Sequence, residues 1–75
     1  MRLNQLAPGQ KSTVLRFDDA MMGGKLMSMG ILPGSKVELI RTMSAGKTIY
    51  VKVNGHGLAL RSSEASKIML QANTH

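Results

Sequence analysis

The segment from Lys25 to Val37 constrains the fold of this 75-residue chain more than any other part of the sequence. Leu26 and Met29 are three residues apart, so they would share one face of a helix. Gly30 follows at a position where helices commonly end in a left-handed residue. The pair Pro33-Gly34 is typical of a tight turn, because Pro fixes φ and Gly accepts a positive φ. The segment therefore predicts the end of a helix followed by a sharp corner.

Alternation of apolar and polar residues predicts short strands on both sides of this corner. We expect them at residues 11–17, 35–42, 48–53, 58–60 and 67–71. The third is the clearest, with Ile49 and Val51 facing the same way. It is followed by Asn54-Gly55, the strongest short-range signal for a hairpin. In the first strand, Val14 and Phe17 cannot lie on one face without a bulge, so that strand is expected to be irregular.

A helix is expected at about residues 20–29, with Asp18 or Asp19 as its N-terminal cap. Gly23 and Gly24 interrupt this helix, because each Gly costs a helix interior about 1 kcal/mol relative to Ala. Two interpretations follow. The helix begins near Gly24, or the pair marks a close approach or a bend between helical turns.

Five short strands joined by hairpins predict a mostly β fold, a small SH3-like five-stranded barrel. The short helix (about residues 20–29) and a helical turn (about residues 62–66) complete it. Residues 1–75 would form a single domain, with 72–75 as a disordered tail. The alternation assigns these residues to the core: Val37, Leu39, Ile49, Val51, Val53, Leu58, Leu60, Ile68 and Leu70.

The net charge is +6, from ten Lys and Arg against four Asp and Glu. The basic residues are spread along the sequence, whereas nucleic-acid-binding proteins usually cluster them and add aromatic stacking residues. Phe17 and Tyr50 are the only aromatic residues. We therefore favour a solvated basic surface and expect no nucleic acid partner. An acidic partner, an anionic membrane face, or a basic small-barrel nucleic-acid-binding protein are the alternatives.

The chain has no Cys, which excludes disulfides, thiolate metal sites and a Cys nucleophile. No apolar run is long enough for a signal peptide or a membrane span. We expect a soluble, cytoplasmic protein that does not insert into the membrane.

The sequence predicts no catalytic residues, no cofactor and no metal ligands. Gly46-Lys47-Thr48 is similar to the end of a phosphate-binding loop, but the required earlier Gly is replaced by Arg41 and a strand follows instead of a helix. His56 and His75 have no ligand partner at metal-binding spacing. No Ser has an evident base beside it. We therefore expect a protein that is not an enzyme.

Seven Met residues are more than a barrel of this size is expected to bury. Met fills cores, but it also suits adaptable docking surfaces. Met21 and Met27 lie off the stripe formed by Met22, Leu26 and Met29, so the helix would be apolar on two sides. We predict a partner-binding surface formed by Met21, Met22, Leu26, Met27, Met29 and Leu32, flanked by Lys25 and Lys36.

Two motifs resemble those of the FeoA family, whose members are small cytosolic accessory proteins of bacterial ferrous iron transport. The first is Leu26-x-x-Met29-Gly30-Ile31-x-Pro33-Gly34-x-x-Val37, and the second runs from Gly55 through Leu58-Ala59-Leu60-Arg61 to Glu64-Ala65 and Ile68. The resemblance covers about Leu3 to Leu70. Two departures are His56 in a place often held by an aromatic residue, and Ala45-Gly46-Lys47-Thr48, which lacks the family's usual Pro.

The resemblance implies an SH3-like domain, a fold that also occurs at the C-terminus of metal-dependent repressors. It implies a regulatory protein that docks on the cytosolic G-protein-containing region of the ferrous iron transporter FeoB. We also consider weak homo-oligomerisation. A detached metal-sensing regulatory module is a further alternative.

Overall fold

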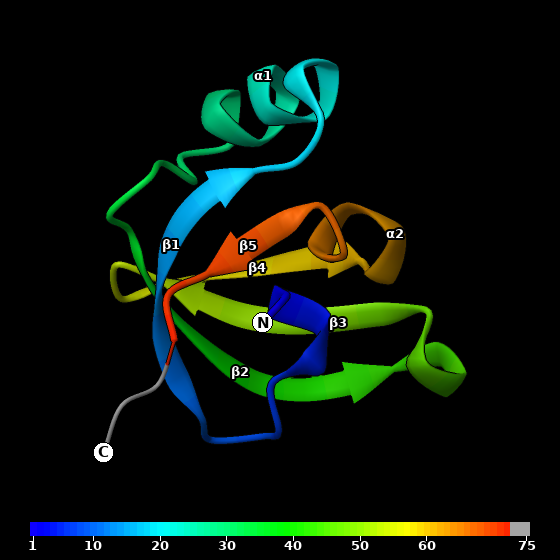
Figure 1. Cartoon of the computed structure of the whole chain (residues 1–75). Helices are drawn as coiled ribbons and strands as arrows, with labels where there is room; N and C mark the ends of the chain where they lie inside the picture. Colours follow the sequence, from blue (N-terminus) through cyan, green and yellow to red (C-terminus); the bar gives the residue numbers. More distant parts are fainter. Residues whose placement is uncertain (73–75) are drawn as a thin grey trace.

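The computed structural model describes residues 1–72. Within them five strands, two short α-helices and two 3₁₀ turns occur (Figure 1). The strands are β1 (Lys11–Phe17), β2 (Lys36–Met43), β3 (Thr48–Val53), β4 (His56–Arg61) and β5 (Ile68–Leu70). The helices are α1 (Ala20–Ser28) and α2 (Ser62–Ala65), and the 3₁₀ turns are η1 (Leu3–Gln5) and η2 (Ser44–Gly46). The mostly β fold is confirmed; of the expected tail, residues 73–75 lie outside the described residues.

All strands belong to one antiparallel sheet with the order β4-β3-β2-β1-β5. β1 pairs with two different strands. Its first residues pair with β2, and its last residues pair with β5. The register shifts between Val14 and Arg16, at the start of the pairing with β5. This is the irregularity expected in the first strand. It lets the sheet curve round its core (Figure 1).

The corner after α1 has the predicted conformation. Gly30 and Gly34 both have a φ of 92°, which favours Gly at both positions. The Ile31 N–H donates to the Leu26 carbonyl at 3.0 Å, and the Gly34 N–H donates to the Val14 carbonyl at 2.7 Å. The corner therefore joins the end of α1 to the middle of β1.

The core confirms the predicted strand faces, with one exception. Buried side chains come from every strand, from α1 and from the N-terminal arm: Leu3, Leu6, Val14, Leu26, Ile31, Val37, Leu39, Ile49, Val51, Val53, Leu60, Ala65, Ile68 and Leu70. Leu58 was expected among them but is only half-buried and packs against the cluster from outside. The prediction was wrong at this position because Leu58 lines an open pocket of about 210 Å³ between the β3–β4 hairpin and the end of α1, whereas Leu60 on the same strand is buried.

α1 includes both glycines. Asp19 caps it, accepting hydrogen bonds from the backbone N–H groups of Met21 and Met22 at 3.0 and 3.2 Å. Gly23 is buried, and a Cβ there would lie 3.2 Å from Cδ2 of Phe17. Of the two interpretations, the structure supports the close approach. A Cβ added at Gly24 would have no neighbouring atom within 4 Å.

This difference makes the two glycines a matched pair of test sites. Gly24→Ala is expected to stabilise the domain by about 0.5–1 kcal/mol, because Ala is the better helix former and meets no neighbour. Gly23→Val is expected to destabilise it, since the branched side chain must displace Phe17. Urea unfolding followed by circular dichroism measures both. Equal midpoints for the two variants would contradict the packing of Phe17 on Gly23.

Candidate partner-binding surface on α1

The outer side of α1 and the corner after it expose apolar side chains. Met21 is 89% exposed, Met27 46% and Leu32 49%. We call these three residues the apolar surface. Figure 1 shows α1 at one end of the barrel, where its outer side is clear of the sheet. Among the described residues, the other exposed large apolar side chains are Met1 and Leu15, so three of the five lie on α1 and the corner after it. Exposed apolar side chains close together in the chain are a common mark of a contact site.

The other predicted residues of this surface have different positions. Leu26 is fully buried, so the prediction that it contacts a partner directly is wrong; it faces the barrel and fixes α1 in place. Met22 and Met29 are half-buried and pack against the core, which leaves part of each side chain accessible. The i, i+4 and i+7 stripe predicted from the sequence is thus the inner face of the helix.

Lys25 links α1 to α2 through an ion pair that sequence analysis did not reveal. Its Nζ lies 2.6 Å from Oε2 of Glu64, whose side chain is buried. Oε1 of Glu64 accepts a hydrogen bond from the Arg61 backbone N–H at 2.9 Å. The hydrogen bond from Lys25, followed by the one from Arg61, lowers the pKa of Glu64 from its ordinary value. The charge of Lys25 is therefore largely compensated within the domain.

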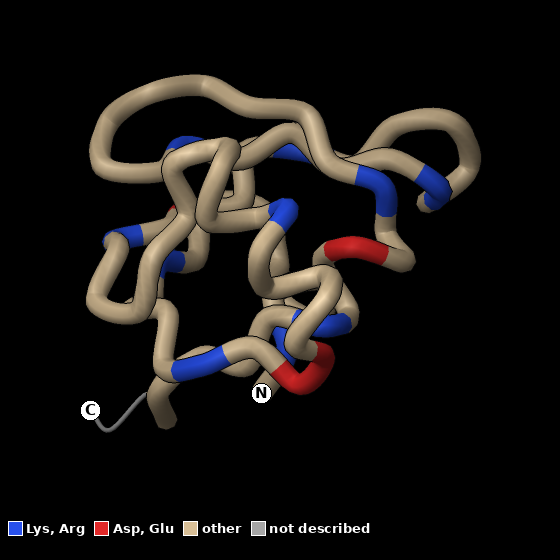
Figure 2. Tube along the Cα trace, turned by 90° about the horizontal axis from the view of Figure 1, so that it is seen from above, with Lys and Arg blue, Asp and Glu red and all other residues tan. Residues whose placement is uncertain are grey.

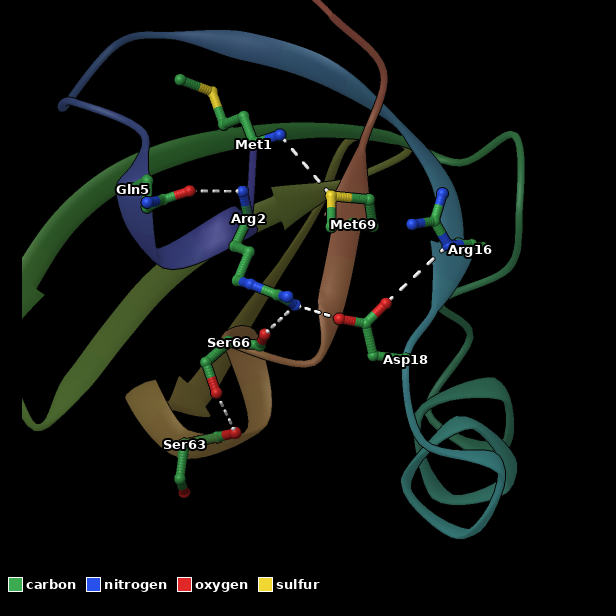
Figure 3. A network of polar contacts seen from close by, with 8 residues as sticks. All are labelled: Met1, Arg2, Gln5, Arg16, Asp18, Ser63, Ser66 and Met69. Carbon is green, nitrogen blue, oxygen red and sulfur yellow. Dashed lines mark hydrogen bonds and ion pairs between the residues drawn. The ribbon is translucent and has the colours of Figure 1, made fainter.

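A second polar network fixes the segment that leads into α1 (Figure 3). The guanidinium of Arg2 donates to the carboxylate of Asp18 and, at 2.9 Å, to the Ser66 carbonyl. Arg16 lies 3.8 Å from the same carboxylate. The hydrogen bond from Arg2 lowers the pKa of Asp18. These contacts hold the N-terminal arm, β1 and the loop after α2 together at the start of α1. The sequence offered no signal for the role of Arg2.

Lys36 does not belong to the apolar surface. It lies at the start of β2 and lines a groove of about 400 Å³ together with Lys11 and Lys52. Its Nζ is 3.4 Å from the Thr13 hydroxyl of β1. The two lysines predicted to flank the surface therefore lie apart: Lys25 contacts α2, and Lys36 lies on the strands.

Within residues 1–72, no three His, Cys, Asp or Glu side chains come together in a way that could hold a metal ion. His56 is exposed at the start of β4, and His75 lies outside the described residues. In the same part of the chain, no helix has the length and apolar character needed to cross a membrane.

The model of the FeoA domain family matches residues 1–72. The chain belongs to the FeoA family. Among solved structures, the FeoA-like protein of Clostridium acetobutylicum is 27% identical, with a TM-score of 0.87; the match covers 100% of this chain and 91% of that one. The zinc complex of Stenotrophomonas maltophilia FeoA, described as a procaryotic SH3 domain protein, is 24% identical with a TM-score of 0.80, covering 95% and 89%. No curated protein matches.

The same fold occurs as part of larger regulators. A manganese-dependent transcriptional repressor is 25% identical to this FeoA-family chain, with a TM-score of 0.84; the match covers 93% of the chain and 39% of the repressor. The predicted SH3-like fold, and its occurrence in both FeoA proteins and metal-dependent repressors, are confirmed.

Proposed function

We propose that this FeoA-family domain is a non-enzymatic accessory protein of ferrous iron uptake. It acts by docking on the cytosolic G-protein-containing region of the transporter FeoB. Family membership supports the link to iron transport. The observation that supports docking is the exposure of Met21, Met27 and Leu32 on one end of a barrel whose core is otherwise well buried.

The contact would combine flexible side chains with a helix backbone that is fixed to the barrel. Met has three rotatable bonds and a polarizable sulfur, so Met21 and Met27 can follow a partner that changes shape during its cycle. The helix carrying them is held by buried Leu26, by the cap at Asp19 and by the Lys25–Glu64 ion pair. Such a surface transmits a change in position between the transporter and the barrel.

Met21→Asp and Met27→Asp are expected to weaken binding to the cytosolic region of FeoB by at least about tenfold in Kd, equivalent to about 1.4 kcal/mol for each. The reason is that a carboxylate at the centre of an apolar contact must be desolvated without a partner. Pull-down and calorimetric titration measure the loss, and circular dichroism checks that each variant is folded.

The matched control is Asn4→Asp, which adds the same charge at an exposed position on η1. It is expected to bind as the unmodified protein does. If both Met variants bind normally while folded, the docking surface lies elsewhere and the assignment to α1 is wrong.

A further inference from the structure

The ion pairs among the described residues lie around the helices and the start of α1. The ion pairs within residues 1–72 use the carboxylates of Asp18 and Glu64, and Asp19 caps α1. These three residues lie in or next to the helices. Glu38, on β2, is the one remaining acidic residue of the sequence. Figure 2 shows the acidic residues confined to a few short stretches, while Lys and Arg occur all round the trace.

Among residues 1–72, four of the seven cations without an ion pair lie on or beside the outer face of β1, β2 and β3. Lys11 lies opposite Glu38, which in turn lies opposite Lys52, so these three side chains form a row across β1, β2 and β3. Lys36 precedes Glu38 by two residues on the same face, and it lies opposite Thr13. Tyr50 shares the face with Lys52, and Arg41 lies opposite Tyr50. We call Lys11, Lys36, Arg41 and Lys52 the basic face.

None of these four cations has a carboxylate within ion-pair distance among the described residues. Three of them line the groove of about 400 Å³, which is open to solvent and floored by the sheet. Four positive charges against one carboxylate on a broad strand surface create a field that attracts polyanions.

The same face lacks what a single-stranded nucleic acid needs. Tyr50 is the aromatic residue on it, and the guanidinium of Arg41 lies 5.3 Å from the centroid of its ring. The end of the ring rests on Gly57, where a Cβ would overlap the Tyr50 hydroxyl. The ring is thus already packed on the domain itself, so it is a poor platform for stacking bases. The observations favour an anionic surface that needs no stacking.

We propose that the basic face binds the surface of an anionic phospholipid bilayer. Each Lys or Arg near such a surface contributes about 1 kcal/mol, and phospholipids can rearrange beneath fixed charges. The groove is lined by Lys11, Lys36 and Lys52 and by one carboxylate, Glu38, so its net positive charge would attract phosphate headgroups. Binding is peripheral and electrostatic, and it leaves the apolar surface on α1 free for a protein partner.

The test is co-sedimentation of the whole chain with vesicles of phosphatidylcholine, with and without phosphatidylglycerol. Binding is expected only to vesicles that contain phosphatidylglycerol. It is expected to disappear in about 1 M salt, where the Debye length is about 3 Å. Because the vesicles contain no transporter, the result is independent of docking on FeoB.

The double variant Lys11→Gln with Lys52→Gln is expected to lower the vesicle partition coefficient about 30-fold, which corresponds to two charges at about 1 kcal/mol each. The control with the same net charge is Arg16→Gln with Lys67→Gln, since both residues lie near Asp18 and away from the groove. It is expected to bind within about twofold of the unmodified protein.

Three outcomes would overturn the proposal. The first is equal binding by the two double variants, which would mean that only net charge matters. The second is binding that persists in high salt, which would indicate insertion of apolar side chains. The third is competition by a single-stranded oligonucleotide. If the oligonucleotide releases the domain from the vesicles when its phosphate concentration is below that of the lipid phosphate, nucleic acid is the better ligand.

Discussion

Leu26→Ala is expected to lower the free energy of unfolding by about 2–5 kcal/mol. Leu26 is fully buried between α1 and the barrel, and its backbone carbonyl accepts the hydrogen bond that sets the corner. A single core in a chain of this size supplies only about 3–5 kcal/mol. A large fraction of the variant should therefore be unfolded at 25 °C, and urea unfolding followed by circular dichroism measures the change.

The control for this variant is Met21→Ala on the same helix. Met21 is 89% exposed, so its truncation is expected to change stability by no more than about 0.5 kcal/mol. The pair separates the two sides of α1. If Leu26→Ala and Met21→Ala unfold at the same urea concentration, the buried position of Leu26 is incorrect.

Glu64→Gln is expected to destabilise the domain by about 1–2 kcal/mol at neutral pH. The variant keeps the shape of the side chain, but it loses the charge that attracts Lys25 and strengthens the hydrogen bond from Arg61. Hydrogen bonds to charged groups contribute more than this to stability when both groups are buried. We expect the smaller value because the Lys25 side chain is more than half exposed.

The effect of Glu64 should depend on pH with a definite sign. Its pKa is lower in the folded protein than its ordinary value of 4.5, so its contribution is complete above that value. The contribution is lost as the pH falls through the folded pKa. The stability difference between the unmodified protein and Glu64→Gln should therefore shrink in acid. A stability difference that stays the same as the pH falls would contradict this role of the Glu64 carboxylate.

Local chemistry was enough to predict the corner and most of the core. Pro33, Gly34 and the preceding Gly30 restrict the backbone by themselves, so the corner could be predicted without knowledge of the fold. The period-two pattern of β3 assigned Ile49 and Val51 to the core correctly. The prediction for Leu58 was wrong because the same pattern does not reveal the open pocket between the β3–β4 hairpin and the end of α1.

The contacts around α1 could not be predicted in this way. Lys25 and Glu64 are 39 residues apart in sequence numbering, and their pairing depends on how α1 and α2 pack. Lys36 was placed beside the helix because it is near in sequence, whereas the strand direction carries it to the groove. The exposed position of Met21 and Met27 was predictable, since both lie off the apolar stripe of the helix.

The sharing of β1 between two partners has a consequence for the synthesis of the protein. Of the five strands, β1 is the first to be synthesised, and one of its two partners, β5, is the last. The sheet therefore cannot be completed until residue 70 has emerged, and the second half of β1 has no partner strand until then. The domain should fold only after nearly all of it has been translated, which makes its yield in the cell sensitive to chaperones that bind incomplete sheets.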